Sequence, residues 1–410
     1  MGNVQDIVAS VIEEEKVKNF KKKTGKESYP LGHSFEAVGQ LRTRLMPKDP
    51  FLIYKINSRN LNGEPSYVLK MSRIQAKLAV AMDEENDDFL CDEYCFFDGT
   101  FKRCPGFVTL GAHVYVEILR KVVKIATMEC ETESTETMII FWTLLNEVLE
   151  QFTGKKGYKF NPKGWAVDEH GGNWAAIKAV YGECAVRDKT VGCEFYFKQS
   201  VVRHARHLKS FKTQQKFKIL ADKLMTSATP KCYKEAYDNL REFMEVKPKK
   251  RGFLSTWLQW WNDRKGHFAR AFKPVDAARV NMSEAYHSSY ATTGSTGLKL
   301  VDAAYKDTVL ALRLERALEL YGQGVKCQGV GPSGKKRQKR DHAEQSKRAH
   351  EYGDILLEEG EISDCNTSRP SVNQTKDSKD KPITLSSSSS DSEKEQKKRR
   401  KTEGNERNGR

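Results

Sequence analysis

The sequence lacks any apolar run of about 18 residues, the length that a membrane-spanning helix needs. Its first residues also lack the pattern of a secretory signal peptide. The 9 cysteines are odd in number and contain no C-x2-C pair, which argues against a disulfide framework. Together these absences predict a soluble intracellular protein with reduced thiols and no membrane partner.

The last eighty or so residues lack the composition needed to bury a core. From residue 331 the chain is low-complexity, with basic clusters at 335–340 and 397–401 and a serine run from Ser386 to Ser390. We therefore expect a disordered basic and serine-rich tail over 331–410. The clusters have the composition of nuclear-import or nucleic-acid patches and predict a nuclear protein, with a merely solubilising tail as the alternative.

The chain is basic: it has 70 Lys and Arg residues and 55 Asp and Glu residues, which gives a formal net charge of +15. Most of that excess precedes the tail, so the foldable part is itself basic. A basic folded surface indicates polyanionic partners, with nucleic acid first and an anionic membrane surface second.

The order of apolar patterns predicts an α/β fold. Residues 1–50 form a polar charged lead-in, and 51–90 form a small α+β lead-in module that packs on the main sheet or stands beside it. Residues 91–199 predict five strands in the order βββ-α-β-α-β, with strands near 92–101, 106–118, 121–130, 164–170 and 190–200. Ser134 is the expected N-cap of the first long helix.

Beyond residue 200 no strand pattern is present up to Pro274. Helical periodicity there predicts an all-helical insertion over 200–274. The pattern of residues 275–330 predicts helices that complete the core. Between Lys198 and Lys218 the insertion has no acidic residue, so one face can contact phosphates or simply be solvated. The residues expected at DNA are Lys198, Arg203, Arg206, Lys209, Lys212, Lys216 and Lys218, with Trp257, Trp260 and Trp261 either stacking on bases or forming a core stripe.

Two acids stand out in the predicted sheet. Asp98 lies within an aromatic, strand-like run, where an ionised carboxylate is costly unless it is paired, hydrogen-bonded or metal-bound. The alternative is a hairpin turn at Asp98-Gly99. Asp168 ends the next predicted strand, and sites in open sheets lie at such ends.

A third acid is expected on a later helix. Glu284 begins a new segment after Pro274 and is flanked by Asn281 and His287, which could position a carboxylate or a phosphate. The other downstream candidates are Glu183, Glu194 and Glu235. The order Asp98, Asp168, Glu284 is similar to the catalytic trio of ribonuclease-H-like nucleases and transposases, in which carboxylates hold two divalent ions.

Five longer stretches follow one another along the chain: FFDGTFKRCPGFVTL, FWTLLNEVL, FNPKGWAVDEHGGNWAAI, CEFYFKQS and NMSEAYHSSY. They resemble, in that order, successive blocks of one family, the Mutator-like (MULE) transposases of animal mobile elements. The resemblance implies a ribonuclease-H-like DDE core with a mixed five-stranded sheet, two Mg²⁺ or Mn²⁺ ions bound by Asp98, Asp168 and Glu284, and cleavage and joining of DNA at transposon ends. It also implies a homodimer or higher assembly on terminal and target DNA.

One departure from the family pattern concerns the supporting residues. Many members carry C-x2-H after the fifth strand, whereas here Cys193 is followed by Tyr196, with His204 further along the chain. The resemblance therefore leaves two expectations open. One is an active, metal-dependent transposase, and the other is a domesticated DNA-binding nuclear protein that has lost catalysis.

Overall fold

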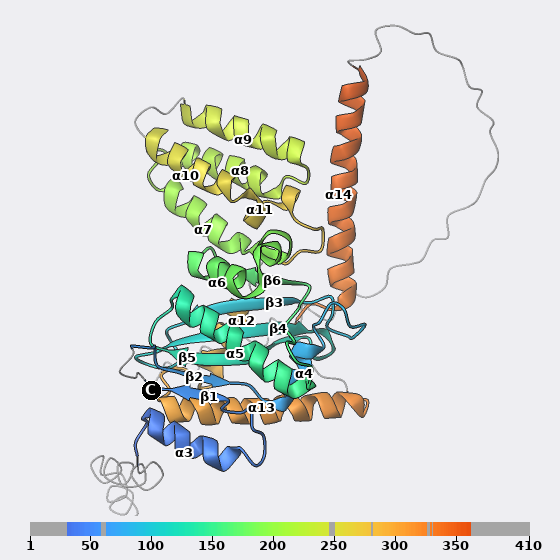
Figure 1. The fold of residues 1–410 in the computed structure, drawn as a ribbon. Coiled ribbons are helices and arrows are strands. Elements are labelled where there is room, and N and C mark those ends of the chain that lie inside the picture. The colour runs from blue at the N-terminus through green and yellow to red at the C-terminus, as the bar shows by residue number, and fades with distance from the viewer. Residues whose placement is uncertain are drawn as a thin grey trace, which may run out of the picture. The chain divides into compact units, whose positions relative to one another are not determined.

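A mixed seven-stranded sheet organises the structure, a computed structural model that describes residues 31–58, 63–245, 251–279, 282–325, 329 and 331–361 (Figure 1). The strand order is β1-β2-β5-β4-β3-β6-β7. The α/β class is thus as expected, although the sheet is wider than the five strands predicted. The strands are β1 (Lys55–Asn57), β2 (Tyr67–Lys70), β3 (Tyr94–Thr100), β4 (Val108–Val116), β5 (Lys121–Cys130), β6 (Gly164–Val167) and β7 (Thr190–Gly192).

The first three predicted strands are confirmed as β3, β4 and β5, which pair antiparallel and form a meander. β6 then pairs parallel to β3, and β7 pairs parallel to β6. Since β5 is antiparallel to β4, it runs in the same direction as β3. The carboxyl ends of β3, β5, β6 and β7 therefore meet at one edge of the sheet, where sites of open sheets form.

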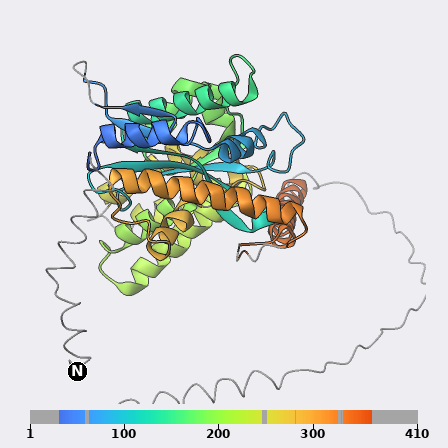
Figure 2. The ribbon, with the colours of Figure 1, turned by 90° about the horizontal axis from the view of Figure 1, so that it is seen from below.

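Helices cover both faces of this sheet. On one face α5 (Thr135–Thr153) begins at the predicted N-cap Ser134, whose hydroxyl accepts from the backbone N–H of Thr137. It packs beside α4 (Arg73–Val80) and α6 (Gly171–Tyr181), and its buried stripe forms the largest apolar core with the sheet. α12 (Ser283–Thr292) packs against β3, β4 and β5, and α13 (Leu300–Gly322) lies beside α3 (Phe35–Leu45) (Figure 2).

The predicted all-helical insertion is confirmed for the described residues. It comprises α8 (Phe211–Thr226), α9 (Pro230–Glu245), α10 (Arg251–Asp263), α11 (Lys265–Phe268) and the short 3-10 turn η4 (Arg270–Phe272). These helices and α7 (Glu194–Ala205) share a second apolar core, separate from that of the sheet, around Phe197, Phe217 and Trp257.

The predicted fifth strand is wrong beyond residue 192. β7 has only three residues, and α7 (Glu194–Ala205) follows it at once. The alternation of Cys193, Phe195 and Phe197 is misleading, because Phe195 is exposed while Cys193 and Phe197 are buried. The buried positions of α7 are Glu194, Phe197, Val201 and Ala205, which is the three-to-four spacing of a helix.

Three predicted segment boundaries also change. The lead-in strands β1 and β2 extend the main sheet, because β2 pairs with β5. Residues 35–45 of the polar lead-in form α3.

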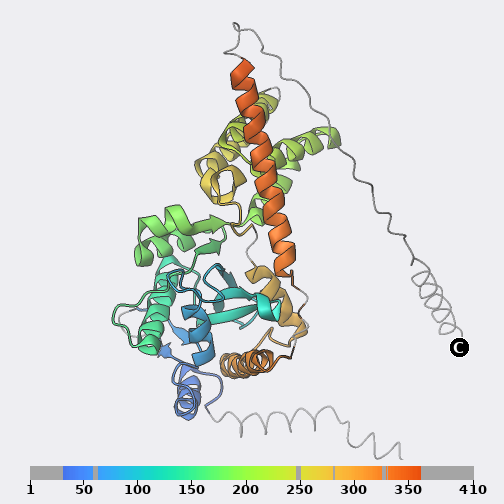
Figure 3. The same cartoon turned by 90° about the vertical axis from the view of Figure 1, so that its right-hand side faces the viewer.

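The predicted disordered tail is wrong for 334–361, which form α14 (Gly334–Glu361). α14 runs along the helical insertion (Figure 3), where Glu351 accepts from the backbone N–H of Ala228. The second basic cluster and the serine run lie outside the described residues.

A buried ionic network ties the sheet to α13. The guanidinium of Arg103, which follows β3, donates to Glu129 of β5 at 2.8 Å and to Asp307 of α13 at 2.5 Å. The amine of Lys70 lies 2.5 Å from each of the same two carboxylates. Lys124 donates to Asp307, and burial lowers the pKa of that lysine to about 7. Three cations thus surround two carboxylates inside the fold.

Candidate functional site

Asp98 lies near the carboxyl end of β3 and is only 5% exposed. Its Oδ1 accepts from the backbone N–H of Gly99 at 2.9 Å, and its Oδ2 lies 3.7 Å from Nδ1 of His287 on α12. The preceding Phe97 packs against the aromatic rings of α5. Since side chains alternate along a strand, Asp98 points to the opposite face, which α12 covers. The hairpin-turn alternative for Asp98 is therefore wrong.

Asp168 follows the last residue of β6, as predicted. The parallel register pairs Tyr94 with Gly164 and Phe96 with Ala166. Continued by two residues, the same register would set position 168 opposite position 98 at the carboxyl edge of the sheet. The two acids, 70 positions apart in the chain, thus lie at the carboxyl ends of neighbouring strands.

The Asp168 carboxylate is held in place from one side. Its Oδ1 accepts from the backbone N–H of His170 at 3.0 Å and from the side-chain amide of Asn173. The indole of Trp174 donates to the backbone carbonyl of Asp168 at 2.9 Å. Burial raises the pKa of Asp168, and the two hydrogen bonds oppose that rise. Both hydrogen bonds end on Oδ1 and fix the direction of the carboxylate.

Glu133 is a third acid at this edge that sequence reasoning missed. A Cβ placed on Gly99 would lie 2.7 Å from Oε1 of Glu133, so the carboxylate rests directly against the backbone beside Asp98. Burial raises the pKa of Glu133 first, and the nearby charge of Asp168 raises it further. Two carboxylates close enough to perturb each other form an electronegative site that favours a cation. Its only signal in the sequence is its position between the end of β5 and the cap Ser134.

α12 carries the position of the predicted third acid. Position 284 lies on α12, three residues before His287. The Glu284 side chain lies outside the part that the structure describes, and so does Asn281. The helix itself contacts β3, the strand of Asp98.

A buried histidine, His113, and a largely buried one, His287, lie near Asp98, and sequence reasoning found only His287. His113 of β4 lies 2.9 Å, through Nδ1, from the hydroxyl of Ser283, and its ring is 5.6 Å from that of His287. Burial lowers the pKa of His113 well below its usual value and that of His287 to about 4. Both imidazoles are therefore neutral near pH 7.

The other downstream acids have structural partners or face solvent. Glu194 lies on a helix rather than on the strand assumed above, and both of its carboxylate oxygens accept from Arg270 at 2.9 Å. Glu183 forms an exposed ion pair with Lys178. Glu235 is exposed on α9.

The predicted DNA-contacting residues divide by exposure. Of the seven cations from Lys198 to Lys218, six are exposed and Lys218 is half-buried. Within the described residues none of the seven forms an ion pair with an acid, so their charge is available at the surface. Trp257 and Trp261 are buried at 5% and 3%, whereas Trp260 is 38% exposed.

The proposed Cys/His support does not gather at the acids. Cys193 is buried directly after β7, next to the acid edge. His204 instead lies on α7, where its ring stacks on Phe253 at 4.7 Å within the helical insertion. The structure therefore brings only Cys193 of this pair to the edge where the strands end.

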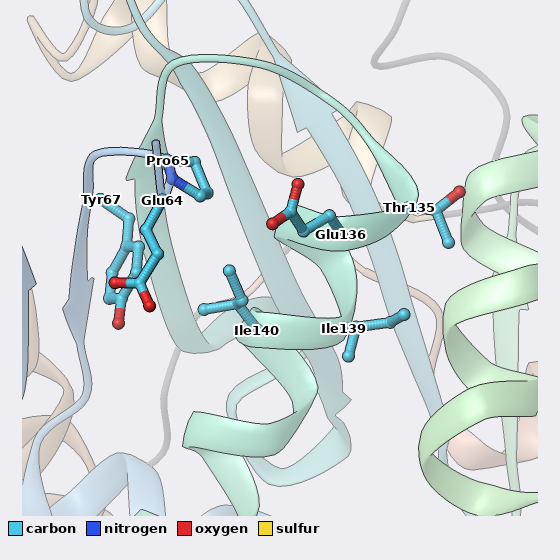
Figure 4. Close-up of a pocket in the computed structure, with 7 residues that line it drawn as sticks. All are labelled: Glu64, Pro65, Tyr67, Thr135, Glu136, Ile139 and Ile140. Carbon is cyan, nitrogen blue, oxygen red and sulfur yellow. The ribbon is translucent and has the colours of Figure 1, made fainter. Parts of the chain in front are cut away.

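A separate cavity of about 610 Å³ lies between β2 and the start of α5 (Figure 4). Its acids are Glu64 and Glu136, and Ile139 and Ile140 form part of its apolar wall. It contains none of the predicted site residues, so we assign it no part in the chemistry.

No protein-family model matches the chain, and no curated protein matches it. Among the described side chains, no group of three or more His, Cys, Asp or Glu is arranged to hold a metal ion. No helix in the described ranges has the length and apolarity needed to cross a bilayer. Any function therefore has to be argued from the geometry of the acid edge and from the sequence resemblance.

Proposed function

We propose that this chain is a DDE-type, transposase-like protein that cleaves DNA at transposon ends and joins the freed strand to target DNA. The observation that carries the proposal is the parallel pairing of β3, which contains Asp98, with β6, which ends directly before Asp168, while α12, which contains position 284, contacts β3. The order β5-β4-β3-β6-β7, in which β4 alone is reversed, supports a ribonuclease-H-like core to which β1 and β2 are added.

The chemistry of the donors fits Mg²⁺ or Mn²⁺. Asp98, Asp168 and Glu284 would hold two such ions through hard carboxylate oxygens, which these cations prefer. The raised pKa of Glu133 beside Asp168 supports the fit, because crowded carboxylates favour a bound cation. When bound, the metal would activate the attacking hydroxyl and stabilise the leaving oxygen.

The chain's own residues position the reacting groups. Asn173 and the backbone N–H of His170 hold Asp168 in one orientation. His287, neutral near pH 7 because burial lowers its pKa to about 4, contacts Asp98 without adding a positive charge. Burial of Asp98 keeps bulk water from one side of the site.

The direct test is cleavage and strand transfer of DNA carrying the element's terminal sequences, with Mn²⁺ present. We expect nicked and joined products that disappear when the metal is chelated. Intact DNA under all metal conditions, from a folded protein that still binds it, would contradict the proposal.

A second candidate is a DNA-binding nuclear protein without catalysis. It is favoured by Tyr196 at the family's histidine position and by a basic surface that does not depend on the acids. The nuclear assignment also rests on the cluster at 335–340, in which Lys335, Lys336 and Lys339 are exposed on α14 while Arg337 pairs with Glu93. The strand-transfer assay separates the two candidates.

We predict that the cations from Lys198 to Lys218 contact the DNA backbone. Replacing Arg203, Lys209 and Lys216 with Gln should weaken binding to all sequences alike. The log–log dependence of affinity on salt should become shallower by about 0.9 for each lost duplex contact.

The control removes the same charge elsewhere, through Gln at the exposed Lys48, Lys77 and Lys155. Fluorescence anisotropy titrations over a range of salt concentrations give the slopes. A slope that is unchanged in the first triple variant, or equally reduced in the control, would show that the basic run is only a solvated helix face.

A further inference from the structure

A cavity of about 600 Å³ opens in the helical insertion, next to the acid edge of the sheet. α7 lines one side of it and α10 lines the other, and Glu169, the residue after Asp168, also borders it. The cavity is therefore one residue along the chain from a proposed metal ligand. Its lining includes Tyr196, Phe253, Trp257, Trp260 and Trp261.

Two of these aromatic rings are exposed to solvent. Phe253 is 46% exposed and Trp260 is 38% exposed, whereas Trp257 and Trp261 form the floor at 5% and 3%. Trp257 is fixed by a hydrogen bond of 2.8 Å from its indole to the hydroxyl of Ser200. Exposed rings above a rigid aromatic floor can bind a flat partner by stacking. Stacking buries apolar surface and costs little side-chain conformational entropy.

The charge around the cavity indicates an anionic partner. Arg203 belongs both to the cavity lining and to the exposed basic run. The guanidinium of Arg264 lies 3.9 Å from the centroid of the Trp260 ring. The one acid in the lining, Glu169, lies 3.4 Å from Nδ1 of His267 and is 11% exposed. A flat group joined to a phosphate chain would stack on the exposed rings and would also supply the negative charge.

Nucleobases are flat, and in single strands their faces are available for stacking on aromatic side chains. A base in a duplex is covered by its neighbours and must leave the stack to enter such a cavity. DNA held at the acid edge would pass near Glu169, where a base that leaves the stack would be able to enter the cavity.

We propose that this cavity binds an unstacked nucleobase of the DNA strand processed at the acid edge, with Phe253 and Trp260 stacking on the base and Arg203 contacting its phosphate. The proposal rests on the proposed function for the source of the unpaired base. The binding step itself needs neither metal nor catalysis, and it can therefore be measured alone.

The test uses single-stranded oligonucleotides carrying 2-aminopurine, whose fluorescence falls when the base stacks, with the metal chelated throughout. We expect wild-type protein to quench the probe. Phe253→Ala and Trp260→Ala should each weaken single-strand binding by roughly 5- to 100-fold, since one stacked base contributes about 1–3 kcal/mol. Phe253→Trp should restore both quenching and affinity.

Phe211→Ala is the matched control, because Phe211 is 74% exposed on α8 and does not line the cavity. Thermal melting confirms that the exposed-site variants fold. The salt slope should not change in Phe253→Ala, because no phosphate contact is removed. Wild-type affinity in both alanine variants, or an equal loss in Phe211→Ala, would overturn the proposal.

The same probe separates this inference from the proposed function. Quenching without any DNA cleavage by the metal-loaded wild type would leave the base site standing and would refute the transposase. Cleavage without quenching would leave the transposase standing and would refute the base site.

Discussion

Asp98→Asn and Asp168→Asn should each abolish DNA strand cleavage while leaving DNA affinity intact or slightly raised. Each change removes one anionic oxygen donor from the carboxyl edge of the sheet without altering the volume of the side chain. Loss of a metal position that contributes several kcal/mol to transition-state stabilisation predicts a rate lower by at least about a thousandfold. Affinity is retained because a negative charge near phosphate is lost rather than gained.

The measurement is a cleavage assay and a filter-binding assay on the same preparations. Asp92→Asn is the matched control, because Asp92 is close in sequence but its side chain is 91% exposed. Retained cleavage in either Asp98→Asn or Asp168→Asn would refute the assignment of the metal site. Loss of cleavage in the control as well would show that the assay reports general destabilisation.

Arg103→Met should lower the free energy of unfolding by about 3–5 kcal/mol, the usual cost of removing one partner from a buried ion pair. The Arg103 side chain is fully buried and bonds Glu129, Asp307 and the backbone carbonyl of Ala303. Without it, Lys70 and Lys124 must compensate two buried carboxylates alone. The link between the sheet and α13 is thereby weakened.

Urea denaturation followed by circular dichroism measures this effect. Arg206→Met is the control, because Arg206 is exposed on the surface and such substitutions usually stay within about 0.5 kcal/mol. A loss below about 1 kcal/mol in Arg103→Met would mean that the network contributes little to stability, as many exposed ion pairs do.

Local sequence patterns predicted the elements whose stability is local. The meander follows from short turns between strand-like runs, and α5 follows from Ser134 and one apolar stripe. The sequence also indicated Asp98 and Asp168. Burying an ionised carboxylate in a strand or at its end costs free energy unless the group is paired, hydrogen-bonded or metal-bound.

The missed features depend on contacts between distant segments. Glu133 looks like an ordinary acid before a helix cap, and only the pairing of β5 with β4 and of β4 with β3 brings it to Gly99. α14 resembles a solvated tail because it is held by polar contacts, such as that of Glu344 with Arg279 at 3.0 Å, rather than by apolar burial. A strand was predicted in place of α7 because CEFYF alternates with the period of two that is typical of a strand. The helical spacing becomes visible only when positions beyond residue 200 are included.

Asp98, Asp168 and Glu284 are proposed to hold divalent metal at one edge of the sheet. Iron-mediated hydroxyl-radical cleavage tests this proposal most directly, because Fe²⁺ in place of Mg²⁺ cuts the backbone next to its own ligands. We expect cuts near residues 98, 168 and 284 together, suppressed by excess Mg²⁺ and lost in Asp98→Asn. Cuts near 98 and 168 with none near 284, and unchanged Mn²⁺ binding in Glu284→Gln, would contradict the choice of third ligand. An absence of cuts at all three positions would contradict the metal site itself.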